Sequence, residues 1–162
     1  MKIAVYPGSF DPVTKGHLNI IKRAAAIFDK VYVCVMINST KQPMFSRDER
    51  VELIKKSCHD MPNVEVDTFG GLLVDYAESV GACAIVKGLR AVSDFDWEFQ
   101  MALANKKIKP EIETLFLASS EKHTYLSSTV VKELGKYGAE LDDFVPPEII
   151  DDVKKKFESG GV

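Results

Sequence analysis

The chain has 162 residues, of which 46% are hydrophobic and 28% charged, and its formal net charge is −3. This length is typical of one domain, here over residues 1–162, that buries about 70% of its unfolded surface without disulfides. The mild acidity argues against a dedicated nucleic-acid-binding protein, and no apolar run reaches the ~20 residues that a membrane helix needs.

The three cysteines are Cys34, Cys58 and Cys83, and they show neither CxxC spacing nor a nearby histidine pair. This pattern predicts neither a zinc site nor a disulfide framework. Cys34 and Cys83 lie in apolar runs, which predicts buried, unreactive thiols. Free thiols fit a reducing compartment, and the N-terminus lacks the apolar run of a secretory leader. We therefore expect a cytoplasmic protein.

The first half of the chain alternates short apolar runs with helical patterns. Strands are predicted at 2–6, 31–37 and 64–68, and helices at 16–28, 47–58 and 72–80. Ser46 and Glu49 have the spacing of a capping box, which marks the start of the second helix.

The alternation continues in the second half. Strands are predicted at 82–87 and 114–118, and helices at 93–108, 127–137 and about 146–158. Ser93 is the expected cap of the first of these helices. The residues of that helix expected to face the core are Phe95, Phe99, Ala102 and Leu103.

Strands that alternate with helices indicate crossover connections and a parallel sheet. We therefore predict an α/β fold with a doubly wound, five-stranded parallel sheet, its apolar strands covered on both faces. In such sheets ligands bind beyond the carboxyl ends of the strands.

The segments after the five predicted strands are expected to meet at that edge. They are 7–17, 38–41, 69–73, 87–90 and 119–129, and they are rich in glycine, hydroxyl and basic residues. Glycines and helix N-termini suit phosphate oxygens, and Lys and Arg supply positive charge, so the edge fits a polyphosphate. The sequence lacks GxxxxGK[ST], and it lacks GxGxxG after the first strand. No carboxylate pair or Cys/His cluster lies there, so no protein-bound metal is predicted.

Each segment also has an ordinary structural interpretation. Thr14 can cap a helix that carries His17 on its surface, and Arg90 can pair with Asp94 or Asp96. A purely structural role for every segment is disfavoured, because all the segments are predicted at the one edge where ligands bind.

Four stretches resemble one family of nucleotidyltransferases that carry a (T/H)xGH motif. They are YPGSFDPVTKGH at 6–17, NSTKQPMFSRDER at 38–50, KGLRAVSDFDWEFQMA at 87–102 and LSSTVVKEL at 126–134. Their order and spacing resemble the phosphopantetheine adenylyltransferases over essentially the whole chain. The resemblance implies a Rossmann-like nucleotidyltransferase fold. The sequence departs from the family pattern at two positions: Lys87, where arginine is commoner, and Gln42, which interrupts a frequent Lys-Lys-Pro.

The family forms dephospho-coenzyme A and pyrophosphate from ATP and 4′-phosphopantetheine with Mg²⁺, usually as a homohexamer. By position, the resemblance implies catalytic roles for His17 and Lys41. The implied phosphopantetheine contacts are Ser9, Lys41, Leu73 and Lys87. The implied ATP contacts are Ser9, Phe10, His17, Gly88, Leu89, Arg90, Glu98, His123, Thr124, Tyr125, Leu126, Ser127, Ser128 and Thr129.

The expected mechanism is in-line attack of the acceptor's own phosphate on the α-phosphorus of ATP, which needs positioning and charge stabilisation and no general base. Two alternatives stay open. One is a related transferase acting on nicotinamide mononucleotide or glycerol 3-phosphate. The other is a non-catalytic nucleotide-binding module, which would bind ATP without releasing pyrophosphate.

Overall fold

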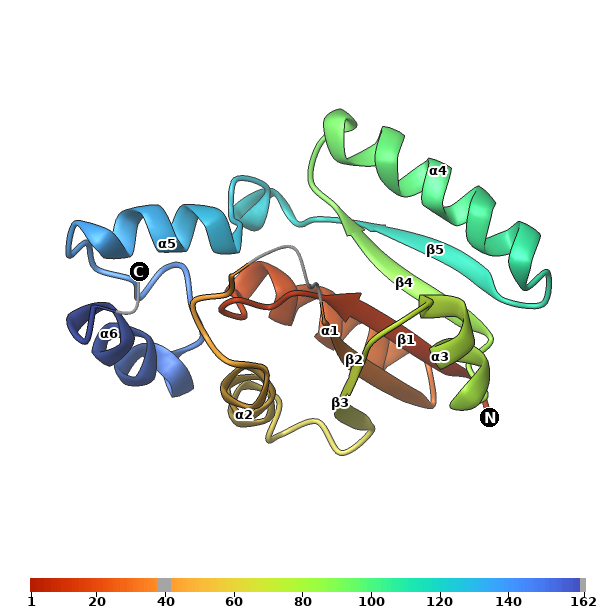
Figure 1. The fold of residues 1–162 in the computed structure, drawn as a ribbon, viewed down its shortest axis with the longest axis horizontal. Helices are drawn as coiled ribbons and strands as arrows, with labels where there is room; N and C mark the ends of the chain where they lie inside the picture. The colour runs from red at the N-terminus through yellow and green to blue at the C-terminus, as the bar shows by residue number, and fades with distance from the viewer. Residues whose placement is uncertain (38–41, 161–162) are drawn as a thin grey trace.

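The computed structural model describes residues 1–37 and 42–160, apart from the side chains of residues 92 and 93. Its centre is a five-stranded, all-parallel sheet with the strand order β3-β2-β1-β4-β5 (Figure 1). The strands are β1 (Ile3–Gly8), β2 (Lys30–Met36), β3 (Val64–Phe69), β4 (Ala84–Leu89) and β5 (Glu113–Ala118). The predicted doubly wound parallel sheet is therefore confirmed.

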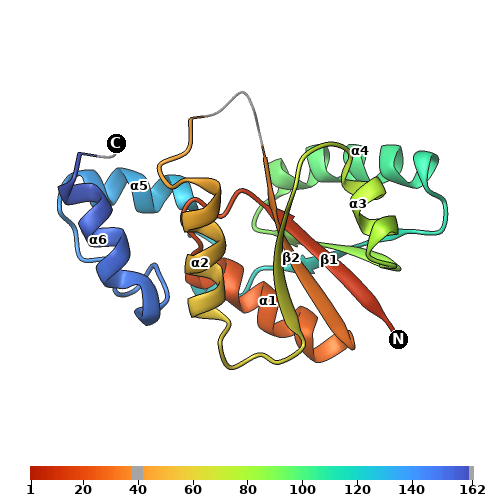
Figure 2. The same cartoon turned by 60° about the horizontal axis from the view of Figure 1, so that its bottom comes forward.

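Helices cover both faces of the sheet. They are α1 (Lys15–Ile27), α2 (Arg47–Ser57), α3 (Leu73–Ser79), α4 (Val92–Ile108), α5 (Ser128–Lys136) and α6 (Ile150–Glu158), with short 3₁₀ turns at Glu121–His123 and Pro147–Ile149. Figure 2 shows α1 and α2 on one face and α3 and α4 on the other. Both α5 and α6 lie beyond the carboxyl ends of the strands (Figure 1). Within the described residues, no helix is long and apolar enough to cross a bilayer.

The core follows from the strand order. In the inner strands, Val5, Val33 and Ile85 are fully buried, because helices cover both faces of the sheet there. The edge strand β3 instead alternates half-buried residues with the exposed Glu65 and Asp67. The expectation of continuous apolar strands therefore holds for the middle of the sheet and fails at this edge.

Two expectations about α4 are wrong. The helix begins at Val92 after Ala91 as N-cap, so Ser93 lies inside it. Phe95, Phe99 and Leu103 are 39%, 44% and 57% exposed, so they do not enter the core. The physical reason is that α4 lies over only β4 and β5, at one side of the sheet. One helix against two strands cannot bury apolar residues all around its circumference.

The prediction of a buried thiol is correct for Cys34 and wrong for Cys83, and the third cysteine, Cys58, is buried as well. Cys83 directly precedes β4, at the amino edge of the sheet, and its thiol is 3.4 Å from the Ile3 carbonyl oxygen.

A tight turn joins β1 to α1. Phe10 has a φ of 48°, in the left-handed region, yet its ring is almost fully buried. The ring packs edge-on against Tyr6 and His17, with centroid distances of 5.4 and 5.0 Å. A Cβ at Gly8 would lie 2.9 Å from the Phe10 ring. Glycine at position 8 therefore leaves the space that this ring occupies.

Replacing Gly8 by alanine should destabilise the fold by about 1–3 kcal/mol, because the Phe10 ring must move out of a packed position. Gly70→Ala is the matched control, since its Cβ would lie 3.7 Å from Ile37, an ordinary contact. We expect the control to change stability by less than about 1 kcal/mol. Urea denaturation of both variants measures the difference, and equal effects would contradict the packing argument.

Candidate active site

A cavity of about 600 Å³ opens at the carboxyl ends of β1, β4 and β5. Its walls come from the β1–α1 turn, the first turns of α1, the end of β4, the start of α4 and the segment between β5 and α5. Cavities of roughly 300–1,000 Å³ are the usual size for small-molecule sites. The cavity therefore lies where the fold predicts a ligand and has room for one.

Most of the residues predicted for the site line this cavity. Those in its wall are Ser9, Phe10, His17, Lys87, Gly88, Arg90, Glu98, His123, Leu126, Ser127 and Ser128. Three distant stretches of the sequence, around residues 9–17, 87–98 and 123–128, are thus brought to one place.

Five predicted residues do not line the cavity: Leu73, Leu89, Thr124, Tyr125 and Thr129. Leu73 begins α3, and the Thr124 hydroxyl donates to the Ser120 carbonyl at 3.1 Å. Tyr125 is 58% exposed, with its ring 6.2 Å from that of Phe144. Lys41 lies outside the described residues.

Thr14 and His17 form a capping box at the start of α1. The His17 backbone N–H donates to Thr14 Oγ1 at 3.3 Å, and the Thr14 backbone N–H donates to His17 Nδ1 at 3.1 Å. A nitrogen that accepts this hydrogen bond carries no proton in the neutral ring, so the network assigns the proton to Nε2. Helix capping by Thr14 and a functional role for His17 are therefore compatible, because the cap orients the imidazole.

The His17 ring is neutral at physiological pH. Burial first, and then the positive charge of Arg90, together lower the pKa of His17 from 6.5 to about 4. Both causes disfavour the charged imidazolium. The side chain therefore presents a neutral Nε2–H donor at the N-terminus of a helix, where backbone N–H groups also favour an anion.

The basic side chains of the cavity are held by carboxylates. Lys87 Nζ lies 3.1 Å from Glu98, and Arg90 Nε lies 3.3 Å from Asp94. Arg90 also donates to the Leu126 carbonyl at 3.3 Å, which links β4 to the segment before α5. The ordinary pairing of Arg90 with Asp94 is thus confirmed, and it fixes the guanidinium at the wall of the cavity.

Several lining residues lay outside the predicted site: Tyr6, Pro7, Gly8, Thr14, Gly16, Ile20, Asp94, Trp97 and Ser119. For three of them, helical spacing from a predicted site residue could have indicated a place in the wall. Asp94 and Trp97 lie four and one positions before Glu98, on one face of α4, and Ile20 lies one turn after His17 on α1. Ser119 begins the segment 119–129 that the strand pattern already placed at this edge. Tyr6 carries no comparable signal, because it lies within the first predicted strand.

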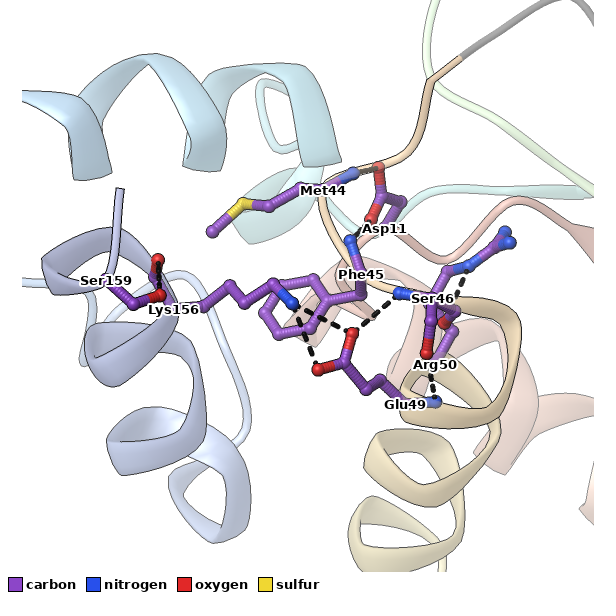
Figure 3. Close-up of polar contacts among 8 residues, drawn as sticks. All are labelled: Asp11, Met44, Phe45, Ser46, Glu49, Arg50, Lys156 and Ser159. Atoms are coloured by element: carbon purple, nitrogen blue, oxygen red, sulfur yellow. Dashed lines mark hydrogen bonds and ion pairs between the residues drawn. The ribbon is translucent and has the colours of Figure 1, made fainter. Parts of the chain in front are cut away.

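One buried carboxylate anchors the loop that carries Ser9 and Phe10. Asp11 accepts hydrogen bonds from the Met44 and Phe45 backbone N–H groups at 2.9 and 2.8 Å (Figure 3). Lys132 of α5 lies 3.1 Å from the same carboxylate. Three segments far apart in the sequence are thereby held at the mouth of the cavity.

Within the described part of the chain, no cluster of three or more His, Cys, Asp or Glu side chains could hold a metal ion. The carboxylates of the cavity, Asp94 and Glu98, are each engaged by a basic partner. The site is therefore built from hydrogen-bond donors and cations, as a phosphate-rich ligand requires.

The chain is similar to known nucleotidyltransferases. A family model described as cytidylyltransferase-like matches residues 5–134. The phosphopantetheine adenylyltransferase of Caldanaerobacter subterraneus subsp. tengcongensis is 56% identical over 98% of this chain and 99% of its own length. That of Clostridium tetani is 54% identical over 96% and 98%.

A solved structure shares the fold. The bifunctional NMN adenylyltransferase/ADP ribose pyrophosphatase of Francisella tularensis superposes with a TM-score of 0.74 at 17% identity, over 99% of this chain and 51% of that one. At this identity the likeness is one of fold alone.

The depressed basicity of His17 gives a direct test of the site geometry. We expect its imidazole to titrate with a pKa of about 4 rather than 6.5, with the neutral ring protonated at Nε2. Between these values the unfolded chain binds the proton and the folded chain does not, so this group makes stability rise with pH and fall as pH drops. NMR of the imidazole nitrogens measures both properties.

Arg90→Met is the informative variant in that titration, because removing the positive charge should raise the pKa of His17. An ordinary midpoint in the unaltered protein, or a proton on Nδ1, would contradict the geometry.

Proposed function

Because this chain belongs to the phosphopantetheine adenylyltransferase family, we propose that its cavity transfers AMP from ATP to 4′-phosphopantetheine and releases pyrophosphate. The product, dephospho-coenzyme A, makes this a step of coenzyme A biosynthesis. The observation that carries the proposal is that one cavity collects the TxGH turn, the Lys87–Arg90 segment and the Ser127–Ser128 helix start.

The reaction is an in-line displacement at the α-phosphorus of ATP. An oxygen of the acceptor's phosphate forms the new bond to phosphorus, and the bond to the bridging oxygen of pyrophosphate breaks. The attacking phosphate is already ionised at neutral pH, so no protein base removes a proton. The protein's task is to position two anions and to stabilise the charge on the reacting oxygens.

His17 is the proposed catalytic donor. Its Nε2–H is fixed by the hydrogen bond that Nδ1 accepts from Thr14, so the donor pays no reorientation cost when charge develops. Gly16, next to it, lines the cavity without a side chain. The backbone N–H groups of Lys15 and His17 already donate to the Phe144 carbonyl and to Thr14 Oγ1, so the contribution proposed for the N-terminus of α1 is the positive end of its helix dipole.

The remaining cavity residues divide between the two ligands. Lys87 is proposed for the acceptor's phosphate, and Ser9 for both ligands. The cavity residues proposed for ATP are Phe10, Gly88, Arg90, Glu98, His123, Leu126, Ser127 and Ser128. Lys87 contributes a point charge, whereas an arginine would bind a phosphate through two parallel hydrogen bonds. Lys41, outside the described residues, is a further proposed contact to the acceptor and to the transition state.

Magnesium is the proposed cofactor, and the cavity fits a metal that arrives on its nucleotide. Mg²⁺ keeps several waters and binds through substrate phosphates in many phosphoryl-transfer sites. When bound, it would neutralise charge on the triphosphate. Arg90 and Lys87 would then complete the binding of the phosphates from the protein side.

The assembly proposed for this protein is a homo-oligomer, a hexamer if it follows the family, in the cytoplasm. Large apolar side chains are exposed on α4: Phe95, Trp97, Phe99, Met101, Leu103 and Ile108. So many large apolar side chains exposed on one helix indicate that a partner covers part of it. Trp97 also lines the cavity, so an interface on α4 would border the catalytic site.

The function is tested by incubating the protein with ATP, Mg²⁺ and 4′-phosphopantetheine and detecting dephospho-coenzyme A by mass spectrometry, with pyrophosphate measured in parallel. His17→Ala should lower turnover about a hundred- to a thousandfold, the worth of one preorganised donor. Circular dichroism should show that the variant stays folded.

Each other outcome of this assay argues against the proposal. Pyrophosphate release only with nicotinamide mononucleotide or glycerol 3-phosphate would assign another acceptor. ATP binding without pyrophosphate release would indicate a regulatory module, and full turnover of His17→Ala would remove that residue from the mechanism.

The assembly is tested by light scattering on a sizing column. We expect the protein to elute as a multiple of its 18.0 kDa chain mass, and Phe99→Glu combined with Leu103→Glu to reduce that mass, because charge is costly in an apolar interface. Lys107→Glu, on an exposed position of the same helix, is the control and should leave the assembly intact. A monomeric wild-type protein would contradict the proposal.

A further inference from the structure

We propose that Lys156, on the C-terminal helix α6, is a positioning residue for the acceptor side of the catalytic cavity, acting through Glu49 and the Met44–Ser46 segment. This inference rests on the proposed function, because it assigns Ser9 to the acceptor's phosphate. The link runs from α6 through the start of α2 to the turn after β1, and each step is a contact between side chains or backbone groups.

The outer end of the link is an ion pair with an aromatic contact. Lys156 Nζ lies 3.0 Å from both carboxylate oxygens of Glu49 and 5.4 Å from the centre of the Phe45 ring. Figure 3 shows the side chain reaching from α6 past this ring towards α2. Phe45 is almost completely buried, whereas the Lys156 side chain is about one-quarter exposed.

The middle of the link is the capping box of α2. The Ser46 backbone N–H donates to Glu49 Oε2 at 2.6 Å, and the Glu49 backbone N–H donates to the Ser46 hydroxyl at 3.2 Å. The hydrogen bond from Ser46 and then the charge of Lys156 hold the pKa of Glu49 below its ordinary value, so the carboxylate is charged. Glu49 thus fixes Ser46 while it is itself fixed by α6.

The inner end of the link reaches the cavity by two routes. The backbone N–H groups of Met44 and Phe45 donate to the buried Asp11 carboxylate. Arg50, on the first turn of α2 and only 6% exposed, donates to the Ser9 carbonyl at 2.9 Å. Ser9 lies in the cavity wall. A shift of the Met44–Ser46 segment therefore moves the turn that holds Ser9.

The same two helices offer a matched control. Lys56 of α2 lies 2.8 Å from Asp152 of α6, so a second ion pair joins α2 to α6. This pair lies at the far end of α2, away from Ser46. Breaking it removes the same kind of contact and the same charge without touching the capping box or the Phe45 ring.

The experiment compares Lys156→Met, Lys156→Arg and Lys56→Met. Methionine keeps most of the aliphatic length that packs on Phe45 and removes the charge, whereas arginine keeps the charge. The first readout is amide hydrogen exchange at Met44 and Phe45, followed by NMR, which needs no substrate. The second is the KM for 4′-phosphopantetheine and for ATP, together with kcat.

We expect Lys156→Met to speed exchange of both amides and to raise the KM for 4′-phosphopantetheine, each by about threefold to tenfold, with a smaller rise in the KM for ATP, most of whose proposed contacts lie on other segments. Lys156→Arg should restore both values, and Lys56→Met should leave both unchanged.

Three results would each overturn the inference. Lys156→Met and Lys56→Met could have equal effects, Lys156→Met could leave the exchange rates unaltered, or it could raise the KM equally for both substrates. A wild-type protein that forms no dephospho-coenzyme A would instead refute the proposed function. In that case the exchange rates alone would still decide whether Lys156 fixes the Met44–Ser46 segment.

Discussion

The turn that forms one wall of the cavity depends on the hydrogen bonds and charge that the buried carboxylate of Asp11 receives. Moving an ionised carboxylate out of water is costly unless charge and hydrogen bonds compensate for the lost hydration. Here Met44 and Phe45 supply two backbone donors, and Lys132 supplies a positive charge. These partners come from the segment before α2 and from α5. The contacts to this one carboxylate therefore join three distant parts of the chain beside the turn that carries Ser9 and Phe10.

Much of the fold is readable from the sequence because its determinants are local. Buried central strands appear as apolar runs, and the spacing of Ser46 and Glu49 marks the start of α2, where the structure places that capping box. The failure at α4 has a different origin. An apolar pattern shows which side chains avoid water, but not what covers them, and Phe99 and Leu103 remain 44% and 57% exposed in the folded chain.

The site shows the same division between local and distant information. The topology rule brought the His17, Lys87 and Ser127 segments together before any contact was known, because parallel strands share one carboxyl edge. The same rule places Asp11 at this edge, but it does not reveal that Asp11 anchors the turn. Its donors are backbone N–H groups, which every residue but proline has, so no residue type at positions 44 and 45 reveals them. Only the folded chain shows which of its donors meet a carboxylate.

His17 combines both kinds of information in one side chain. Its orientation is local, since Thr14 three residues earlier accepts and donates the hydrogen bonds that hold it. Its protonation state is distant in origin, because burial and the charge of Arg90 from the end of β4 suppress the imidazolium. A bound triphosphate would act in the opposite direction, since nearby negative charge favours the protonated ring. Protonation of Nδ1 would remove the acceptor that the Thr14 backbone N–H uses, so the capping hydrogen bond itself disfavours the charged ring. The cap and a bound anion therefore act in opposite directions on the charge of His17, and the cap favours the neutral form with its proton on Nε2.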